Sequence, residues 1–470
     1  MQDGVRNICL LFATATIASL VFVAGAALAQ PVDVPETWGG SLLTRPRLTG
    51  SWGGFRDTLG KKGVVLDVDL LTTPQDVWAG GIRNDAGFWA NAEFTLNVDT
   101  GKLGLWPGGF FKFSGQTAFG EAVLADAGAI DPINTAALVP VPGDDSSALM
   151  NATFTQFLSE EFGLFLGKIY ALDGFHGEFS GNYRTQFWNT ALAIPMALDL
   201  VPLSAYGGGL VGIPWKNVLF TAMALDPRGT PSDNDLTDIF DDGVTLVSTL
   251  QVKIEPCGLV GHQTVGGMWS STNRLSLIQD PSNIATVLAE ERYPALGNPG
   301  PVLTRILERF FPALLVPVEP ANRESDSWAF IYSFDQYLWQ PEGDPKRGVG
   351  LFFNFGVTDG DANPVKYSYA LGIGGNGVIP CRPDDRFGVG WARTQFSDDF
   401  IPFLRKNLDL GLEHEDVVEI FYNVAATGWL DVTFDLQIVN TGLEKKLGSN
   451  MDLANIDTAV IGGLRTYIRF

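Results

Sequence analysis

Stretches in which apolar and polar residues alternate recur along this chain, and they restrict the fold more than any other feature. From Ala90 to Val98 every second residue is apolar and the intervening residues are polar, and Leu430 to Ile438 shows the same pattern. Successive strand residues point to opposite faces, so each stretch has one apolar and one polar face. Several stretches reach about nine to eleven residues, enough to cross a bilayer at a tilt. The pattern therefore favours a transmembrane β-barrel over a soluble sandwich, whose strands average about five or six residues.

The spacing of the strands supports the same fold class. We expect an all-β protein, a transmembrane antiparallel β-barrel of sixteen strands, an even number as bacterial single-chain barrels have. Long links follow residues 119, 170, 225, 270, 396 and 439, and they mostly alternate with short ones, as outer loops alternate with periplasmic turns. The expected strands cover 64–71, 88–98, 109–119, 150–158, 162–170, 209–214, 217–225, 244–254, 259–270, 327–338, 348–358, 365–373, 386–396, 416–424, 429–439 and 457–470.

The N-terminus has the form of a secretory signal peptide. Arg6 precedes an apolar run from Ile8 to Ala29 that ends in Ala-Leu-Ala, an A-x-A cleavage site. The run is long enough for a membrane anchor, but the polar, proline-containing continuation after Gln30 favours cleavage. We expect three regions, namely a cleaved signal peptide (1–29), a periplasmic arm with a short helix (30–63) and the barrel (64–470).

Composition excludes several classes of function. The net charge of −22 argues against nucleic acid as a partner, because phosphate binding needs a basic surface. The three histidines, His176, His262 and His414, do not occur at metal-ligand spacing, and no G-x-S-x-G or P-loop motif is present. The sequence therefore predicts no enzyme, metal or cofactor. It leaves open a barrel-borne hydrolase, whose triad is recognised by geometry rather than spacing, and a secreted glycan-binding β protein.

Residues 47–70, RLTGSWGGFRDTLGKKGVVLDVDL, closely resemble the N-terminal region of the carbohydrate-selective porins of the OprB type. The positions shared with that family are Leu48, Thr49, Gly50, Trp52, Gly53, Gly54, Arg56, Leu59, Lys62 and Gly63. Weaker similarity is found in LGKIYALDGF (166–175), FWNTAL (187–192), RPDDRFGVGWA (382–392) and the closing GLRTYIRF (463–470). The chain departs from the family at FDLQIVNTG (434–442), which lacks the family's prolines.

The resemblance implies a function and a location. It implies a sixteen-stranded outer-membrane barrel whose loops fold inward, in contact with lipid and lipopolysaccharide, and often assembled as a homotrimer. It also implies passive, selective diffusion of neutral monosaccharides or short oligosaccharides. From the residues themselves, a general or cation-biased porin of the same fold, without a saccharide site, stays open as an alternative.

The third long link, 171–208, is the expected constriction loop. It interleaves aromatic residues with arginine, glutamate and amides, groups that can contact sugar hydroxyls and C–H faces. We expect sugar contacts from Glu178, Tyr183, Arg184 and Trp188, with the alternative that the aromatic residues only pack the loop against the wall. On the wall, Lys112 and Arg465 are expected to oppose acidic groups across the pore.

Three further expectations concern local structure. Ser51 is a candidate cap for a short helix that runs through Leu59 and ends at Gly60 and Gly63, with an ordinary N-terminal arm as the open alternative. Cys257 and Cys381 fall in links on the periplasmic side and form a candidate disulfide, with the free state equally open. Strand parity predicts that the following wall residues face the lumen: Asp67, Asp69, Asn91, Glu93, Lys112, Gln116, Asn354, Glu419, Asn423, Asp431, Asp435, Arg465 and Arg469.

Overall fold

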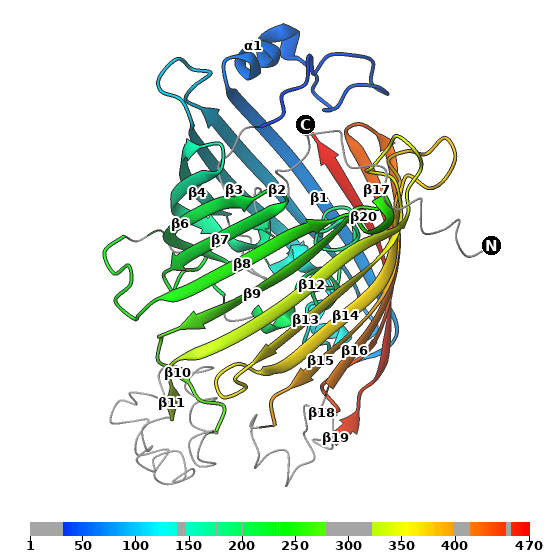
Figure 1. Ribbon diagram of the computed structural model, residues 1–470. Coiled ribbons are helices and arrows are strands. Elements are labelled where there is room, and N and C mark those ends of the chain that lie inside the picture. The colour runs from blue at the N-terminus through cyan, green and yellow to red at the C-terminus, as the bar shows by residue number, and fades with distance from the viewer. Residues whose placement is uncertain are drawn as a thin grey trace, which may run out of the picture.

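A single closed barrel accounts for nearly all the secondary structure (Figure 1). The protein is described by a computed structural model that covers residues 32–138, 147–174, 176–198, 201–232, 234, 236–278, 322–398, 414–447 and 453–470. Sixteen antiparallel strands each pair with their sequence neighbours, and the last barrel strand pairs with the first to close the barrel. The expected fold class is confirmed. The expected signal peptide lies outside the described residues.

Each expected strand overlaps one observed barrel strand, and three expected strands have the observed bounds. The barrel strands are β1 (Val64–Gly81), β2 (Ala86–Asp99), β3 (Gly109–Glu121), β4 (Ser147–Ser159), β5 (Phe162–Tyr170), β6 (Ser204–Trp215), β7 (Val218–Leu225), β8 (Thr245–Ile254), β9 (Gly261–Ser270), β12 (Ser327–Trp339), β13 (Gly348–Thr358), β14 (Val365–Asn376), β15 (Arg386–Phe396), β16 (His414–Thr427), β17 (Leu430–Asn440) and β20 (Asp457–Arg469). Two small ribbons in the outer loops pair β10 (Arg274–Leu275) with β11 (Arg323–Glu324), and β18 (Lys445–Leu447) with β19 (Leu453–Asn455).

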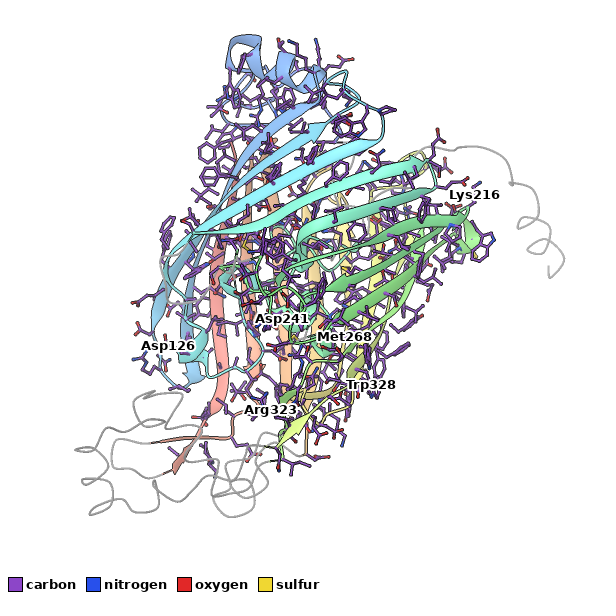
Figure 2. All side chains as sticks on the ribbon, turned by 90° about the vertical axis from the view of Figure 1, so that its left-hand side faces the viewer. Asp126, Lys216, Asp241, Met268, Arg323 and Trp328 are labelled. Atoms are coloured by element: carbon purple, nitrogen blue, oxygen red, sulfur yellow. The ribbon has the colours of Figure 1, made fainter. Side chains whose placement is uncertain are left out.

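The alternation of the sequence separates the two faces of the wall. Phe94, Ile373 and Phe434 are about half exposed and point outward, where a bilayer would cover them. Their strand neighbours, such as Asp435, point into the barrel and are buried there. Tryptophans lie on the outer surface at both ends of the wall, as in the aromatic girdles of membrane barrels, and Trp328 and Lys216 mark these opposite ends in Figure 2. The exposed tryptophans of the strands and turns are Trp78, Trp106, Trp215, Trp269, Trp328 and Trp339.

The two ends of the barrel differ in the length of their connections. At one end, turns as short as the one between β4 and β5 join the strands, whereas the other end carries links such as 171–203. The end with short turns faces the periplasm in barrels of this kind. None of the helices in the described part of the chain is long and apolar enough to cross a membrane.

The N-terminal helix differs in detail from the expectation. It consists of a 3₁₀ turn, η1 (Trp52–Gly54), followed by α1 (Phe55–Lys61), and the side chain of Ser51 caps neither of them. Gly54 is the residue before α1, and Gly63 ends the segment with a φ of +82°, as expected. Gly60 lies inside the helix, where a Cβ atom would come within 2.4 Å of the Trp38 ring. Gly60 therefore serves packing and does not end the helix.

The remaining helices are short and lie in the connections. They are α2 (Leu124–Ala127) and η2 (Thr135–Leu138) after β3, η3 (Ala171–Gly174), α3 (Thr190–Ala193) and η4 (Met196–Leu198) after β5, and η5 (Pro256–Gly258) after β8. We call the connection after β3 (122–146) loop L2 and the connection after β5 (171–203) loop L3. The described parts of L2 and L3 lie inside the barrel (Figure 1).

Candidate functional site

Loop L3 enters the barrel because its apolar side chains pack on the inner wall. Phe187 is fully buried, and its ring centroid lies 4.8 Å from that of Phe421 on β16 and 5.3 Å from that of Phe352 on β13. The strand β15, which lies between them beside β16, makes room with glycine, since a Cβ atom on Gly390 would come within 2.7 Å of Leu192. The interior of the barrel is therefore partly filled by protein on this side.

Charged wall residues hold the main chain of L3. The carboxylate of Glu419 on β16 accepts hydrogen bonds from the N–H groups of Trp188 (2.6 Å) and Asn189 (3.0 Å). The guanidinium of Arg465 on β20 donates to the carbonyl oxygens of Tyr183 (2.6 Å) and Gln186 (2.7 Å). Main-chain groups that leave water need such partners. The two charged groups therefore fix the loop at four main-chain positions between Tyr183 and Asn189.

Loop L2 is held in the same way and is joined to L3. The carboxylate of Glu415 on β16 accepts hydrogen bonds from the N–H groups of Ile130 (2.8 Å) and Asp131 (3.0 Å). The Thr135 N–H donates to the Trp188 carbonyl at 2.8 Å, which connects L2 directly to L3. The two loops form one inward layer against β1, β2, β14, β15, β16, β17 and β20.

Most of the residues expected to contact sugar lie within this layer. Trp188 and Arg465 are each 1% exposed, and the guanidinium carbon of Arg465 lies 4.9 Å from the Trp188 ring centroid. Arg184 stacks on Tyr183 at 4.6 Å and forms an ion pair with Glu93 at 2.5 Å. Burial raises the pKa of the Tyr183 hydroxyl to about 12. These contacts hold the loop to the wall.

The remaining two expected residues lie at the edge of the layer. Lys112 forms an ion pair with Asp173 of η3 at 2.7 Å. Glu178 accepts a hydrogen bond from the Tyr337 hydroxyl at 3.0 Å, and burial, with the nearby Asp335 carboxylate, raises its pKa. The structure thus brings Tyr183, Arg184, Trp188 and Arg465 together, whereas Lys112 and Glu178 occupy separate places.

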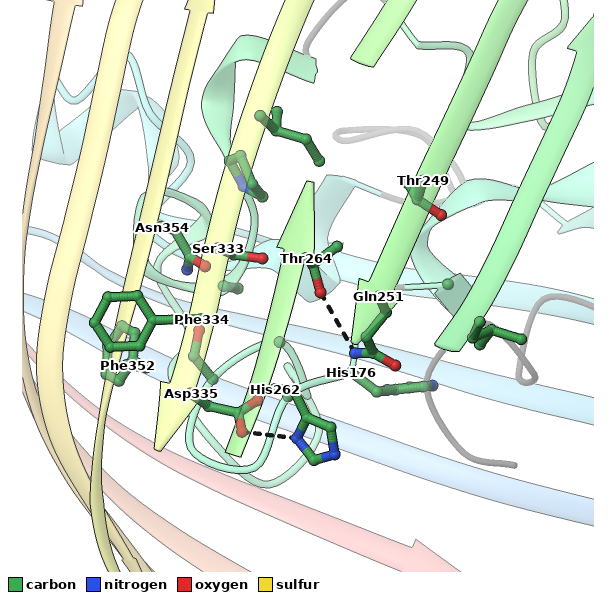
Figure 3. A pocket seen from close by; sticks show the side chains of 18 residues that line it. His176, Thr249, Gln251, His262, Thr264, Ser333, Phe334, Asp335, Phe352 and Asn354 are labelled. Atoms are coloured by element: carbon green, nitrogen blue, oxygen red, sulfur yellow. Dashed lines mark hydrogen bonds and ion pairs between the residues drawn. The ribbon is translucent and has the colours of Figure 1, made fainter. Parts of the chain in front are cut away.

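A cavity of about 120 Å³ lies on the other side of L3, and none of the six expected residues lines it. It is bounded by the wall strands β7, β8, β9, β12 and β13 and by the face of L3 that carries His176 and Ser180 (Figure 3). Burial lowers the pKa of His176 to about 4, so its imidazole is neutral at physiological pH. The lining residues are Gly174, His176, Gly177, Ser180, Gly181, Ala193, Pro195, Leu219, Thr249, Gln251, His262, Thr264, Ile331, Ser333, Phe334, Asp335, Phe352 and Asn354.

Four polar side chains form a row across the wall of this cavity. Gln251 on β8 is the register partner of Thr264 on β9, Thr264 is the partner of Ser333 on β12, and Ser333 is the partner of Asn354 on β13. Because neighbouring strands are about 4.8 Å apart, the row spans about 14 Å. Two residues further along the same strands, the His262 imidazole donates through Nδ1 to Asp335 Oδ1 at 2.8 Å (Figure 3). The row offers amide and hydroxyl groups, which both donate and accept hydrogen bonds.

Sequence reasoning identified Asn354 as facing the lumen but missed the rest of the row. Gln251, Thr264 and Ser333 occupy positions of their strands that face the lumen, and the alternation of the sequence is the one signal that could have identified them. Most candidates have charged or aromatic side chains in L3, and Tyr183, Arg184 and Trp188 face the wall on the side of L3 away from the cavity. No cluster of three or more histidine, cysteine or acidic side chains suited to a metal ion occurs in the part of the chain that the structure describes.

The candidate disulfide does not form. Cys257 and Cys381 are both free and exposed. Cys257 lies in the turn between β8 and β9 and Cys381 in the turn between β14 and β15, with β9, β12, β13 and β14 between them. At about 4.8 Å per strand, this separation exceeds the roughly 7 Å between Cα atoms that a disulfide tolerates.

Comparison with known proteins assigns the chain to a family. A model of the carbohydrate-selective porins, OprB family, matches residues 83–470. The chain belongs to this family. The family match begins after residues 47–70, the segment whose resemblance was most specific. Together with the barrel fold, membership places the protein in the outer membrane.

The individual relatives share less than a third of their residues with this chain. Porin B of Pseudomonas aeruginosa is 29% identical over 143 residues, a match that spans 28% of this chain and only 30% of Porin B. A high-pH structure of Pseudomonas putida OprB has a TM-score of 0.72 at 19% identity, covering 92% of this chain and 100% of that one. The low-pH structure of the same protein has a TM-score of 0.53 at 14% identity, covering 91% and 99%. These solved structures show that the fold is shared.

Proposed function

We propose that this protein is a passive outer-membrane channel for small neutral sugars, either monosaccharides or short oligosaccharides, and not an enzyme. The observation that carries the proposal is the row of Gln251, Thr264, Ser333 and Asn354 on the wall opposite L3. A row of about 14 Å can offer hydrogen bonds to several hydroxyls of a sugar at once. The family description, carbohydrate-selective porin, supports the same substrate class.

The pairing of charges inside the barrel also supports neutral substrates. Despite the net charge of −22, Lys112 and Arg184 are matched with Asp173 and Glu93 close to the loop layer. Paired charges produce a weaker field than isolated ones, so a neutral solute loses little by entering. Among the described lining residues, Phe352 is the one phenylalanine at an inward-facing strand position, since Phe334 alternates with Ser333 and Asp335 and packs on Phe353. We therefore expect weak, hydrogen-bonded recognition that allows fast release.

Related features of the proposal concern the chain ends and assembly. The cleaved signal peptide over residues 1–29 and the periplasmic arm over residues 30–63 remain part of it. A homotrimer in contact with outer-membrane lipid and lipopolysaccharide is expected from the family resemblance.

The proposal is tested by single-channel recording from refolded protein in a planar bilayer while glucose and maltose are titrated. Discrete channels that sugar blocks saturably are expected. Asn354→Leu and Gln251→Leu should each weaken the block about fivefold, because each removes hydrogen bonds worth about 1 kcal/mol. Ser248→Val, at the outward-facing neighbour of Thr249, is the matched control and should leave the block unchanged. Channels that are indifferent to sugar would indicate a general porin instead.

A further inference from the structure

The cavity has an asymmetric charge. Among its described lining residues, Asp335 is the only carboxylate, and neither lysine nor arginine is present. The Asp335 side chain is buried except for 10% of its surface. Its Oδ1 atom accepts the hydrogen bond from His262 Nδ1 at 2.8 Å, and its Oδ2 atom lies 3.5 Å from the Glu178 N–H. Among the described residues, the Oδ2 atom thus has this one long, weak contact, and it can accept further hydrogen bonds from the cavity.

Several cations of the lumen near L3 interact with groups other than Asp335, and one of them, Arg386 on β15, donates to the Thr185 hydroxyl at 2.6 Å. Lys112 faces Asp173, Arg184 faces Glu93, and Arg465 donates to loop carbonyl groups on the far side of L3. His176, which faces the cavity from L3, is neutral near pH 7 because burial lowers its pKa to about 4. Among the described lining residues no lysine or arginine opposes the Asp335 charge, and the imidazole of His262, which is positive only when protonated, is its one basic neighbour. Lys253, the register partner of His262 on β8, pairs with Glu255 at 3.0 Å.

We propose that this cavity selects among sugars by charge, admitting neutral and protonated amino sugars and rejecting uronates and sugar phosphates, with Asp335 as the specificity-determining residue. This inference rests on the proposed function, a sugar channel. A carboxylate between protein walls repels a second anion more strongly than it would in bulk water, because the local dielectric constant is lower. It attracts an ammonium group for the same reason, as acidic rings do in cation channels.

His262 is the positioning residue for this carboxylate. Its Nδ1–H group occupies Oδ1 and fixes the rotation of the carboxylate, which leaves Oδ2 directed away from the histidine. The two residues are direct register partners on β9 and β12, so the wall itself sets their separation. Replacement of His262 by asparagine preserves a donor near the position of Nδ1, whereas replacement by leucine removes it.

The test compares three sugars of similar size in the same wild-type channel. Permeation of glucosamine, glucose and glucuronate is measured by reversal potential and liposome swelling at pH 7. The expected order is glucosamine, then glucose, then glucuronate, with about a tenfold difference between the charged sugars, as expected for one partly buried charge. Asp335→Asn should bring this ratio close to one. Asp398→Asn removes the same charge from an exposed outer position and should leave the ratio unchanged.

The His262 variants separate positioning from folding. His262→Asn should keep most of the selectivity and His262→Leu should lose most of it, while both proteins keep heat-modifiable mobility in detergent. Equal permeation of glucosamine and glucuronate through wild-type channels that glucose blocks would overturn the inference and leave the sugar channel intact. Channels that ignore all sugars would overturn the proposed function and the inference with it. The wild-type ratio decides the question even if a variant fails to fold.

Discussion

At the residue scale, the charged side chains inside this barrel bind main-chain atoms of the loops. Glu415 and Glu419 each accept two or more loop N–H groups, and Arg465 donates to two loop carbonyl groups. A charge buried in a wall is stable only when its hydrogen-bonding capacity is used. The N–H and carbonyl groups of the loops form these hydrogen bonds, and the same bonds hold the loops in one position.

Arg465 offers a direct test of this role. Arg465→Ala removes both hydrogen bonds to L3 and leaves Glu419 and Asp435 without their neighbouring cation. We expect the free energy of unfolding in detergent to fall by about 3 to 5 kcal/mol, as when one partner of a buried charged cluster is removed. We also expect larger and noisier single-channel currents, because L3 is released.

The control for this prediction keeps the charge and changes the geometry. Arg465→Lys retains a cation but lacks the planar fork that reaches two carbonyl groups. It should recover part of the stability and leave the noise raised. Quiet channels of wild-type conductance in Arg465→Ala would show that L3 does not depend on this residue.

The site residues show which part of the chemistry the sequence reveals. The position of L3 could be predicted because its length and polarity stand out after a complete strand. The face that each side chain presents could not, because an irregular loop has no period to indicate orientation. Trp188 and Tyr183 were chosen for their aromatic rings, and those rings are buried against the wall. The row from Gln251 to Asn354 lies in regular strands, where the alternation of the sequence predicts that these side chains face the lumen. None of the four is charged, so the sequence does not distinguish them from other polar wall residues.

At the scale of elements, the strands were predictable because each has one face in lipid and one in the lumen. The largest difference is β1, which continues to Gly81 rather than ending at residue 71. Its second half contains Pro74, which lacks an N–H group and so argues against a strand. The pairing of β1 with β20 is interrupted between Thr72 and Gln75. Pro74 lies in this interruption, so the strand tolerates a residue without an N–H group there.

The turn before β15 shows how a short motif fixes an element. Burial raises the pKa of the Asp385 carboxyl, but hydrogen bonds from Arg382, Tyr422 and the Ala425 N–H outweigh it, and the pKa is lowered overall. The folded pKa is thus below the unfolded value of about 3.9. The resulting stabilisation is present above that value and is lost as the pH falls through the folded pKa.

Asp385→Asn should therefore destabilise the barrel in a pH-dependent way. We expect a loss of about 1 to 2 kcal/mol near pH 7, measured by urea unfolding in detergent with tryptophan fluorescence. The difference from wild type should shrink when the pH falls below about 4. Asp384→Asn, at the exposed neighbouring carboxylate, should change stability little at either pH. A difference that persists unchanged in acid would rule out the proposed charge effect.

At the scale of the whole molecule, segments from opposite ends of the sequence meet at the seam of the barrel. The first strand, β1, pairs with the last, β20, and the Phe470 N–H donates to the Val68 carbonyl at 2.8 Å. The N-terminal arm adds a further connection, since the Leu48 N–H donates to the Arg469 carbonyl at 2.7 Å. The N-terminal arm and the closing strand therefore share hydrogen bonds at the seam of the barrel.

Arg56 on α1 is the residue at which these connections meet. Its guanidinium donates to the main-chain oxygens of Phe470 and Leu66, each at 3.0 Å, and to the Asp67 carboxylate at 2.7 Å. The guanidinium carbon lies 5.3 Å from the Trp38 ring centroid and 4.8 Å from that of Trp52. The side chain is 2% exposed, so all of these interactions are shielded from water.

Arg56→Ala should consequently weaken the seam of the entire barrel. We expect the free energy of unfolding to fall by about 3 kcal/mol, because a buried ion pair is broken and Asp67 retains only Arg47. The loss should appear as a lower temperature for the heat-modifiable shift in gel mobility. Arg83→Ala breaks an ion pair with Asp126 in which the arginine is 67% exposed, and such a pair contributes about 0 to 1 kcal/mol. Equal shifts in the two variants would mean that Arg56 stabilises its helix alone and that the arm does not help to close the barrel.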